Sequence, residues 1–204
     1  MKKISQKQFQ KITKDLKNLI LTEAEKNDWL WFYDLHQKEV VKCAEELLKV
    51  YKANRQIVII ACWLHDISKY QIKSKLDTEK FHKTHHIDSC EFSKKFLANY
   101  AIDDDEREKI CNCVLRHRNT PPYQARTIEE KIVAVADTLS HFTGVFYFTH
   151  FKFNPKGTID SMVKNHLDKL DREWRDLGLL PKSRKIVKPQ FDIIKKLHQN
   201  YLKK

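Results

Sequence analysis

Four residues of this sequence have the types and placement needed to hold a metal ion. The doublet His65-Asp66 directly follows the apolar run Ile57–Leu64, and Asp137 ends a second apolar run. A carboxylate at the end of a buried helix face is costly unless a partner neutralises it, and a divalent cation is such a partner. His36 precedes the apolar stripe of an earlier segment. Imidazole and carboxylate ligands together suit Fe, Mn, Co, Ni or Zn, with Mg a further option.

The segments that carry these residues are predicted to be helices. Apolar positions recur with helical spacing, and the run Ile57–Leu64 predicts a buried helix because no turn signals close it. Only 3 Gly and 5 Pro are present, so the tight turns of a hairpin-rich protein are scarce. We expect an all-α, single-domain bundle of about seven or eight helices. The predicted helices cover 4–21, 29–52, 55–69, 86–99, 103–117, 128–151, 158–177 and a last segment after a linker with Pro181 and Pro189.

The net charge of +12 belongs to the two ends of the chain. Residues 1–20 carry +5, residues 181–204 carry +7, and residues 21–180 are neutral. All the proposed ligands lie in the neutral part. We therefore expect one domain over 1–204, with basic terminal helices at 1–20 and 181–204 flanking a core at 21–180.

Cysteine usage and hydropathy indicate a reducing compartment. The chain has 5 Cys, an odd number, and its first apolar cluster, at 19–21, is too short for a secretory signal. No run approaches the roughly 20 apolar residues of a membrane span. We expect a cytoplasmic protein with free thiols and no membrane partner.

The order His, His-Asp, Asp resembles the HD-domain superfamily of metal-dependent phosphohydrolases. The matching positions are His36, His65, Asp66 and Asp137. The segments ACWLHDISKY and EEKIVAVADTLSHF look like the helices that carry these ligands in that family. The resemblance covers about residues 30–145 and implies that 21–180 is an HD-type catalytic core.

The resemblance also implies ligands for a second metal ion. Family members with two metals carry additional histidines, and the matching residues are His85 and His117. Asp66 would then bridge both ions. His86 competes with His85 for this assignment. We favour His85 because its distance to Ser89 resembles the family pattern.

Three basic residues are candidates for binding a substrate phosphate. Lys69 completes the segment HDISK and shares a helix face with His65 and Asp66. Resemblance implies that such a lysine contacts the phosphate. Arg116 and Arg118 flank His117, and one of them could be a bidentate phosphate clamp.

The implied chemistry is metal-assisted hydrolysis of a phosphate ester. The metal would lower the pKa of a bound water towards about 7 and direct it at phosphorus, and Asp66 would orient that water. The chain has no Gly-Tyr-Pro tripeptide, and Ser68-Lys69-Tyr70 stands where alarmone hydrolases carry two acids. We expect a small phosphomonoesterase or phosphodiesterase, acting on a nucleotide or other small phosphate ester.

The sequence leaves two other classes of function open, nucleic-acid binding and a non-catalytic HD module. The lysines of the terminal helices could bind a nucleic acid, although no recognisable motif accompanies them. A non-catalytic, nucleotide-binding or signalling HD module is the other alternative. The sequence leaves the oligomeric state open.

Overall fold

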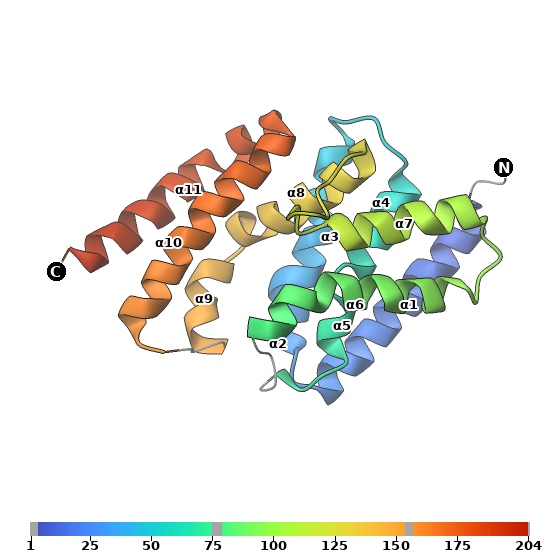
Figure 1. Ribbon diagram of the computed structural model, residues 1–204, viewed down its shortest axis with the longest axis horizontal. Helices are drawn as coiled ribbons and strands as arrows, with labels where there is room; N and C mark the ends of the chain where they lie inside the picture. The colour runs from blue at the N-terminus through green and yellow to red at the C-terminus, as the bar shows by residue number, and fades with distance from the viewer. Residues whose placement is uncertain (1–3, 75–78, 154–156, 204) are drawn as a thin grey trace.

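The computed structural model describes residues 4–74, 79–153 and 157–203, and the regular elements in these ranges are helices (Figure 1). The all-α prediction is confirmed. The first half contains α1 (Gln6–Lys26), α2 (Leu30–Phe32), a π-helical turn (Tyr33–Gln37), α3 (Lys38–Leu48), α4 (Arg55–Leu64) and α5 (Ile67–Tyr70). The second half contains α6 (Glu79–Leu97), α7 (Asp104–Arg116), α8 (Ile128–Thr143), α9 (Phe146–Phe153), α10 (Ile159–Asp176), a 3-10 turn (Leu177–Leu179) and α11 (Pro181–Leu202).

Two helices form the centre of the molecule. In α4 every residue from Ile57 to Leu64 is buried, because α1, α3, α7 and α8 pack around it. In α8 the apolar run before Asp137 is buried in the same way. Both helices have polar N-caps, Asn54 for α4 and Thr127 for α8, whose side chains accept hydrogen bonds from the first-turn amides. The two apolar runs that precede the predicted ligands therefore form the centre of the core.

The terminal helices pack on this core in different ways. In α1 the buried residues recur every three or four positions, from Phe9 to Ala24, and its lysines face outward. Helices α10 and α11 lie side by side at the end of the molecule that holds the C-terminus (Figure 1). No helix within the described ranges has the length and apolarity that crossing a lipid bilayer requires.

Two predicted boundaries are wrong. The predicted helices leave 70–85 without a helix, but α6 begins at Glu79. In this part of α6, His82 and Lys83 line the cavity described below. Pro181 and Pro189 are predicted to lie in a linker, but α11 begins at Pro181 and continues through Pro189. Proline is well tolerated at the first helical position, and buried Val187 and Phe191 hold the helix against the core on both sides of Pro189.

Two long predicted helices are interrupted. The segment 29–52 divides into α2, the π-helical turn and α3, and the segment 128–151 divides at Gly144 between α8 and α9. The π-helical turn inserts an extra residue into the helical path. This interruption lies at His36, a predicted metal ligand.

Candidate metal centre

Four of the six predicted ligands lie where a helix begins, ends or changes pitch. His36 lies in the π-helical turn, a feature that occurs frequently at functional sites. The adjacent Gln37 is fully buried and donates from Nε2 to the backbone carbonyl of Cys62 at 2.8 Å. This bond fixes the π-helical turn to the last turn of α4, directly before His65.

The doublet His65-Asp66 lies at the break between α4 and α5. His65 is the C-cap of α4 and still has helical dihedral angles, whereas Asp66 leaves the helix with φ −116° and ψ 18°. The break turns the two neighbouring side chains towards the same interior point. His117 is placed similarly, as the C-cap of α7. By contrast, His85 and Asp137 project from within α6 and α8.

One group of ligand atoms comes from His36, His65 and Asp137. The Nε2 atoms of His36 and His65 are 3.2 Å apart. Asp137 Oδ1 lies 3.2 Å from His36 Nε2 and 3.9 Å from His65 Nε2. These three atoms are close enough to hold one metal ion. We call this group the first triad.

A second group comes from Asp66, His85 and His117. The Nε2 atoms of His85 and His117 are 3.2 Å apart, and Asp66 Oδ1 lies 3.2 Å and 3.7 Å from them. This second triad could also hold one metal ion. His86, the competing candidate, is outside it and has its ring against Tyr123, with centroids 5.5 Å apart. The structure therefore brings together His85 and not His86.

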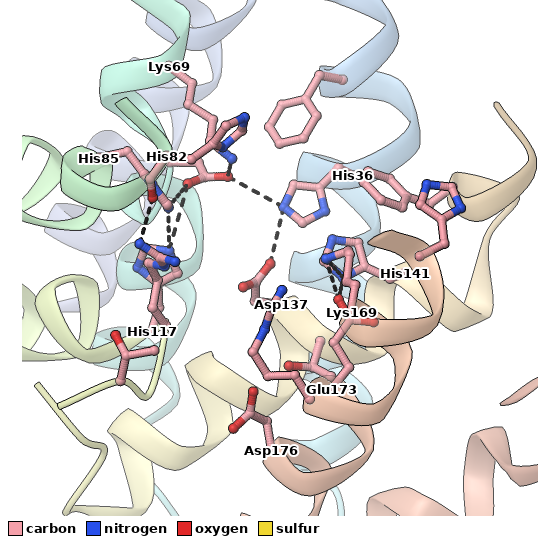
Figure 2. A pocket seen from close by; sticks show the side chains of 18 of the residues that line it. His36, Lys69, His82, His85, His117, Asp137, His141, Lys169, Glu173 and Asp176 are labelled. Atoms are coloured by element: carbon pink, nitrogen blue, oxygen red, sulfur yellow. Dashed lines mark hydrogen bonds and ion pairs between the residues drawn. The ribbon is translucent and has the colours of Figure 1, made fainter. Parts of the chain in front are cut away.

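Asp66 faces both triads. Its Oδ1 belongs to the second triad, while its Oδ2 lies 3.6 Å from His36 Nε2 and 3.5 Å from His65 Nε2 in the first. Figure 2 shows His36 on one side of the site and the His85–His117 pair on the other, and Asp66 has one oxygen near each. A carboxylate placed in this way can bridge two cations.

Three of the four imidazoles have the same fixed tautomer. In each, Nδ1 lies close to the carbonyl oxygen of the residue three positions earlier. Because a carbonyl oxygen only accepts, Nδ1 carries the hydrogen and Nε2 presents a lone pair to its triad. The pairs are His65 with Cys62 at 2.7 Å, His85 with His82 at 2.8 Å, and His117 with Val114 at 2.7 Å.

The fourth imidazole, His36, is fixed by a serine. Ser140 Oγ donates its one hydrogen to the carbonyl of Asp137 at 2.7 Å. The same oxygen lies 3.0 Å from His36 Nδ1, so it accepts a hydrogen bond from that nitrogen. His36 Nε2 therefore presents a lone pair when the ring is neutral. Burial would lower the pKa of His36, but hydrogen bonds to Asp137 and Asp66 raise it, so a metal ion bound at Nε2 would displace a proton. Such orientation of a metal-binding imidazole by a hydrogen bond at its other nitrogen is typical of metal sites.

These tautomers fit metal ions in both triads. In each triad two Nε2 atoms face each other at 3.2 Å, an arrangement that a cation between them would stabilise. Asp66 Oδ1 is buried and has no hydrogen-bond partner in the described part of the chain. A buried carboxylate oxygen without a partner costs roughly 1–3 kcal/mol or more. The donor set of imidazole and carboxylate groups suits divalent transition metals.

Apart from the raised pKa of His36, the charges of the site agree with this assignment. Burial lowers the pKa of His65 and His85, and it lowers the pKa of His117 to about 4, so these rings are neutral near pH 7. Burial alone would raise the pKa of Asp66 and Asp137. The surrounding lysine and histidine side chains outweigh burial and hold both values well below the usual range. Neutral imidazoles and ionised carboxylates are the forms that bind metals.

The three basic candidates are placed differently. Lys69 is buried beside the triads, with Nζ 2.8 Å from Asp66 Oδ2 and 4.8 Å above the Phe32 ring. Arg118 lines the cavity that leads to the metal centre, whereas Arg116 does not. Arg116 instead donates to the Gln124 carbonyl at 2.8 Å and lies 3.6 Å from Glu130. Its surroundings are those of a structural residue that anchors the segment before α8.

Sequence reasoning missed the part of the site that α10 contributes. The cavity has a volume of about 810 Å³ and is lined by several α10 side chains, including Lys169, Glu173 and Asp176. In Figure 2 these three lie on the side of the cavity opposite His85 and His117. The available signal was the recurrence of titratable residues every three or four positions between 165 and 176.

His141 joins this α10 wall to the first triad. Its ring is stacked on the His36 ring, with centroids 5.0 Å apart and an interplanar angle of 13°. Its Nδ1 lies 2.7 Å from Glu173 Oε1. Glu173 is buried and also accepts from Tyr147 and Lys169. Helix α10 is thus connected to a predicted metal ligand through a single side chain.

Comparison with known proteins agrees with the geometry. The HD domain family matches residues 33–141, more than half of the chain, and this range includes all six members of the two triads. No curated protein and no solved structure matches the chain. The chain belongs to the HD domain family, a superfamily of metal-dependent phosphohydrolases.

Proposed function

We propose that this protein is a metal-dependent phosphohydrolase with two divalent metal ions, acting on a nucleotide or another small phosphate ester. The observation that carries the proposal is the pair of triads, in which four imidazoles turn Nε2 towards the site and Asp66 has one oxygen on each side. His36, His65 and Asp137 would hold one ion, His85 and His117 would hold the other, and Asp66 would contact both.

The bound metals would supply a hydroxide at neutral pH and positive charge to stabilise the phosphoryl oxygens. The chain's own residues would position the reactants. Asp66 would orient the attacking water, since its carboxylate lies between the triads and stays ionised. Lys69 would bind a phosphate oxygen, because its ammonium group lies beside Asp66 and lines the same cavity. Arg118 would contact the substrate from the second triad's side.

The test combines metal content with hydrolysis. Protein purified without chelator is analysed for transition metals, and its activity is screened on phosphorylated metabolites with Mn, Fe, Co, Ni and Mg. We expect roughly two equivalents of metal and hydrolysis of at least one phosphate ester. Asp66→Asn keeps the shape of the side chain but removes its charge, so it should lose most bound metal and lower kcat by about 100-fold or more.

Asp88→Asn is the matched control. Asp88 lies one turn from His85 on α6, but its side chain is exposed and accepts from Thr84. This variant should keep full metal content and activity. Metal content well below one equivalent in the wild type would contradict the enzyme proposal and favour a non-catalytic HD module. Unchanged turnover in Asp66→Asn would refute the assigned site.

A further inference from the structure

The cavity is larger than a single phosphate bound at the metal centre would require. Its volume of about 810 Å³ extends from the two triads to α10, outside the range that matches the HD domain family. The α10 wall is polar and charged, so it is suited to contacts with a polar part of a ligand. The charged groups on this wall can indicate which chemistry that part has.

Two of the lysines that line the cavity are already neutralised. Lys69 pairs with Asp66, and Lys169 pairs with Glu173, and both carboxylates are buried. Neither lysine therefore adds a net positive charge to the cavity wall. The arginines on the lining differ from them in this respect.

Arg118 has most of its donors available. It is partly buried, and its Nη1 donates to the His82 carbonyl at 2.6 Å. Among the described residues, no carboxylate lies within 4.0 Å of its guanidinium group. A guanidinium group has five N–H donors, and the neutral carbonyl uses only one. The remaining donors are suited to the oxygens of an anion.

Arg172 lies at the exposed rim of the same cavity, on α10. It too has no carboxylate within 4.0 Å in the described part of the chain. Asp176, one turn further along α10, instead accepts from Asn119 at 3.0 Å. Two guanidinium groups from different elements therefore line one cavity, and among the described residues neither has a carboxylate within 4.0 Å, although acids further away on the lining still interact with them. Guanidinium groups bind phosphate and carboxylate through paired hydrogen bonds.

We infer that Arg118 and Arg172 form a binding site for a second anionic group of the substrate, separate from the phosphate at the metal centre. A phosphate dianion matches the two positive charges better than a carboxylate does, so the substrate class is a compound with two separated phosphate groups. The inference rests on the proposed function, because the first phosphate is bound by the metals and Lys69. It adds the specificity-determining role of Arg172, a residue of α10.

The test measures binding of simple alkyl phosphates to the full-length protein loaded with Mn²⁺, by isothermal titration calorimetry. The probes are propyl phosphate, propane-1,3-diol bisphosphate and hexane-1,6-diol bisphosphate, with 4-phosphooxybutanoate as the carboxylate analogue. At least one bisphosphate should bind about 10-fold more tightly than propyl phosphate. The affinity for the carboxylate analogue should lie between those for propyl phosphate and the best bisphosphate.

The variants assign the effect to the two arginines. In Arg172→Gln, and in Arg118→Gln, the preference for the bisphosphate over propyl phosphate should fall to about 2-fold or less. Arg175→Gln is the control, because Arg175 lies on the same helix, is exposed, and is not on the cavity lining. It removes the same charge and should keep the 10-fold preference.

The outcomes separate the two proposals. If propyl phosphate shows no Mn²⁺-dependent binding, the metal centre of the proposed function is wrong. If propyl phosphate binds with Mn²⁺ but no bisphosphate binds more tightly, the second phosphate site is overturned and the metal centre stands. A preference that survives in Arg172→Gln, or disappears equally in Arg175→Gln, also overturns the site. A carboxylate analogue that binds as tightly as the best bisphosphate would overturn the assignment to phosphate.

Discussion

At the scale of single residues, the metal centre depends on hydrogen bonds that lie behind the ligands. Each imidazole presents Nε2 because its Nδ1 is held by an acceptor, and three of those acceptors are backbone carbonyls. His36 is the exception, because its acceptor is the hydroxyl of Ser140. A backbone acceptor cannot be removed by substitution, but a side-chain acceptor can. His36 is therefore the ligand whose orientation can be tested separately.

We expect Ser140→Ala to weaken metal binding by about 10- to 100-fold, the usual effect of removing a hydrogen bond that orients a ligand. The variant leaves His36 Nδ1 without its acceptor inside a buried site. Metal affinity is measured by competition with a chromogenic chelator. Ser93→Ala is the control, since Ser93 is equally buried but donates only to the Ser89 carbonyl of its own helix. Equal affinities in the two variants would show that Ser140 does not orient His36.

At the scale of elements, irregularities in helices serve different purposes. The π-helical turn and the break between α4 and α5 direct His36, His65 and Asp66 to the interior. The proline inside α11 contacts no part of the site. Pro189 is exposed, and it removes the backbone hydrogen bond that its position would otherwise donate within the helix. It is therefore a cost that the packing of α11 on the core offsets.

Replacing Pro189 by alanine should stabilise the protein by about 1–2 kcal/mol. Alanine supplies the backbone N–H that proline lacks, and it removes the clash of the proline ring with the preceding turn. The midpoint of thermal unfolding should rise accordingly. Pro181→Ala, in the same helix, should have no effect or a small destabilising effect, since proline is favourable at the first helical position. If Pro189→Ala also leaves the midpoint unchanged or lowers it, Pro189 is not strained in α11.

At the scale of the whole molecule, a buried charge network attaches α10 to the HD core. Glu173 of α10 accepts from His141 of α8, from Tyr147 of α9 and from Lys169 of its own helix. Burial would raise the pKa of Glu173, but Lys169 and His141 outweigh burial and lower it to about 2. An acid whose pKa is lowered by folding stabilises the folded state at pH values above its pKa in the unfolded chain. That contribution is lost as the pH falls through the folded value.

We expect Glu173→Gln to lower the free energy of unfolding by about 3 kcal/mol near pH 7, because the buried carboxylate that pairs with Lys169 and His141 loses its charge. The difference from the wild type should shrink as the pH falls from about 4.5 towards about 2. Denaturant unfolding at several pH values measures both effects. Glu46 provides the control, because it forms an exposed ion pair with Lys49. The free energy of unfolding of Glu46→Gln should differ little from that of the wild type at any pH. A pH-independent difference in Glu173→Gln would show that the carboxylate is not ionised in the fold.

Much of the fold and of the candidate metal centre could be predicted from the sequence. The apolar runs before Asp66 and Asp137 predict buried helices. The carboxylates that end these runs predict charged partners, because a buried charge without a partner is costly. The scarcity of glycine excludes most tight turns, and helices remain. The order of His36, His65, Asp66 and Asp137 resembles that of the HD domain family, and the family match over residues 33–141 confirms this. These properties are local, so they can be read along the chain.

Only the tertiary structure decided the rest. The choice between His85 and His86 depends on which side of α6 faces Asp66, and the separation of Arg116 from Arg118 depends on the end of α7. The α10 wall of the cavity could not be predicted, because Glu173 and Arg172 meet the site only when α10 packs against α8 and α9. The physical reason is that buried helices are specified by their own apolar residues. A site between helices depends on side chains that are far apart in the sequence and are brought together by packing.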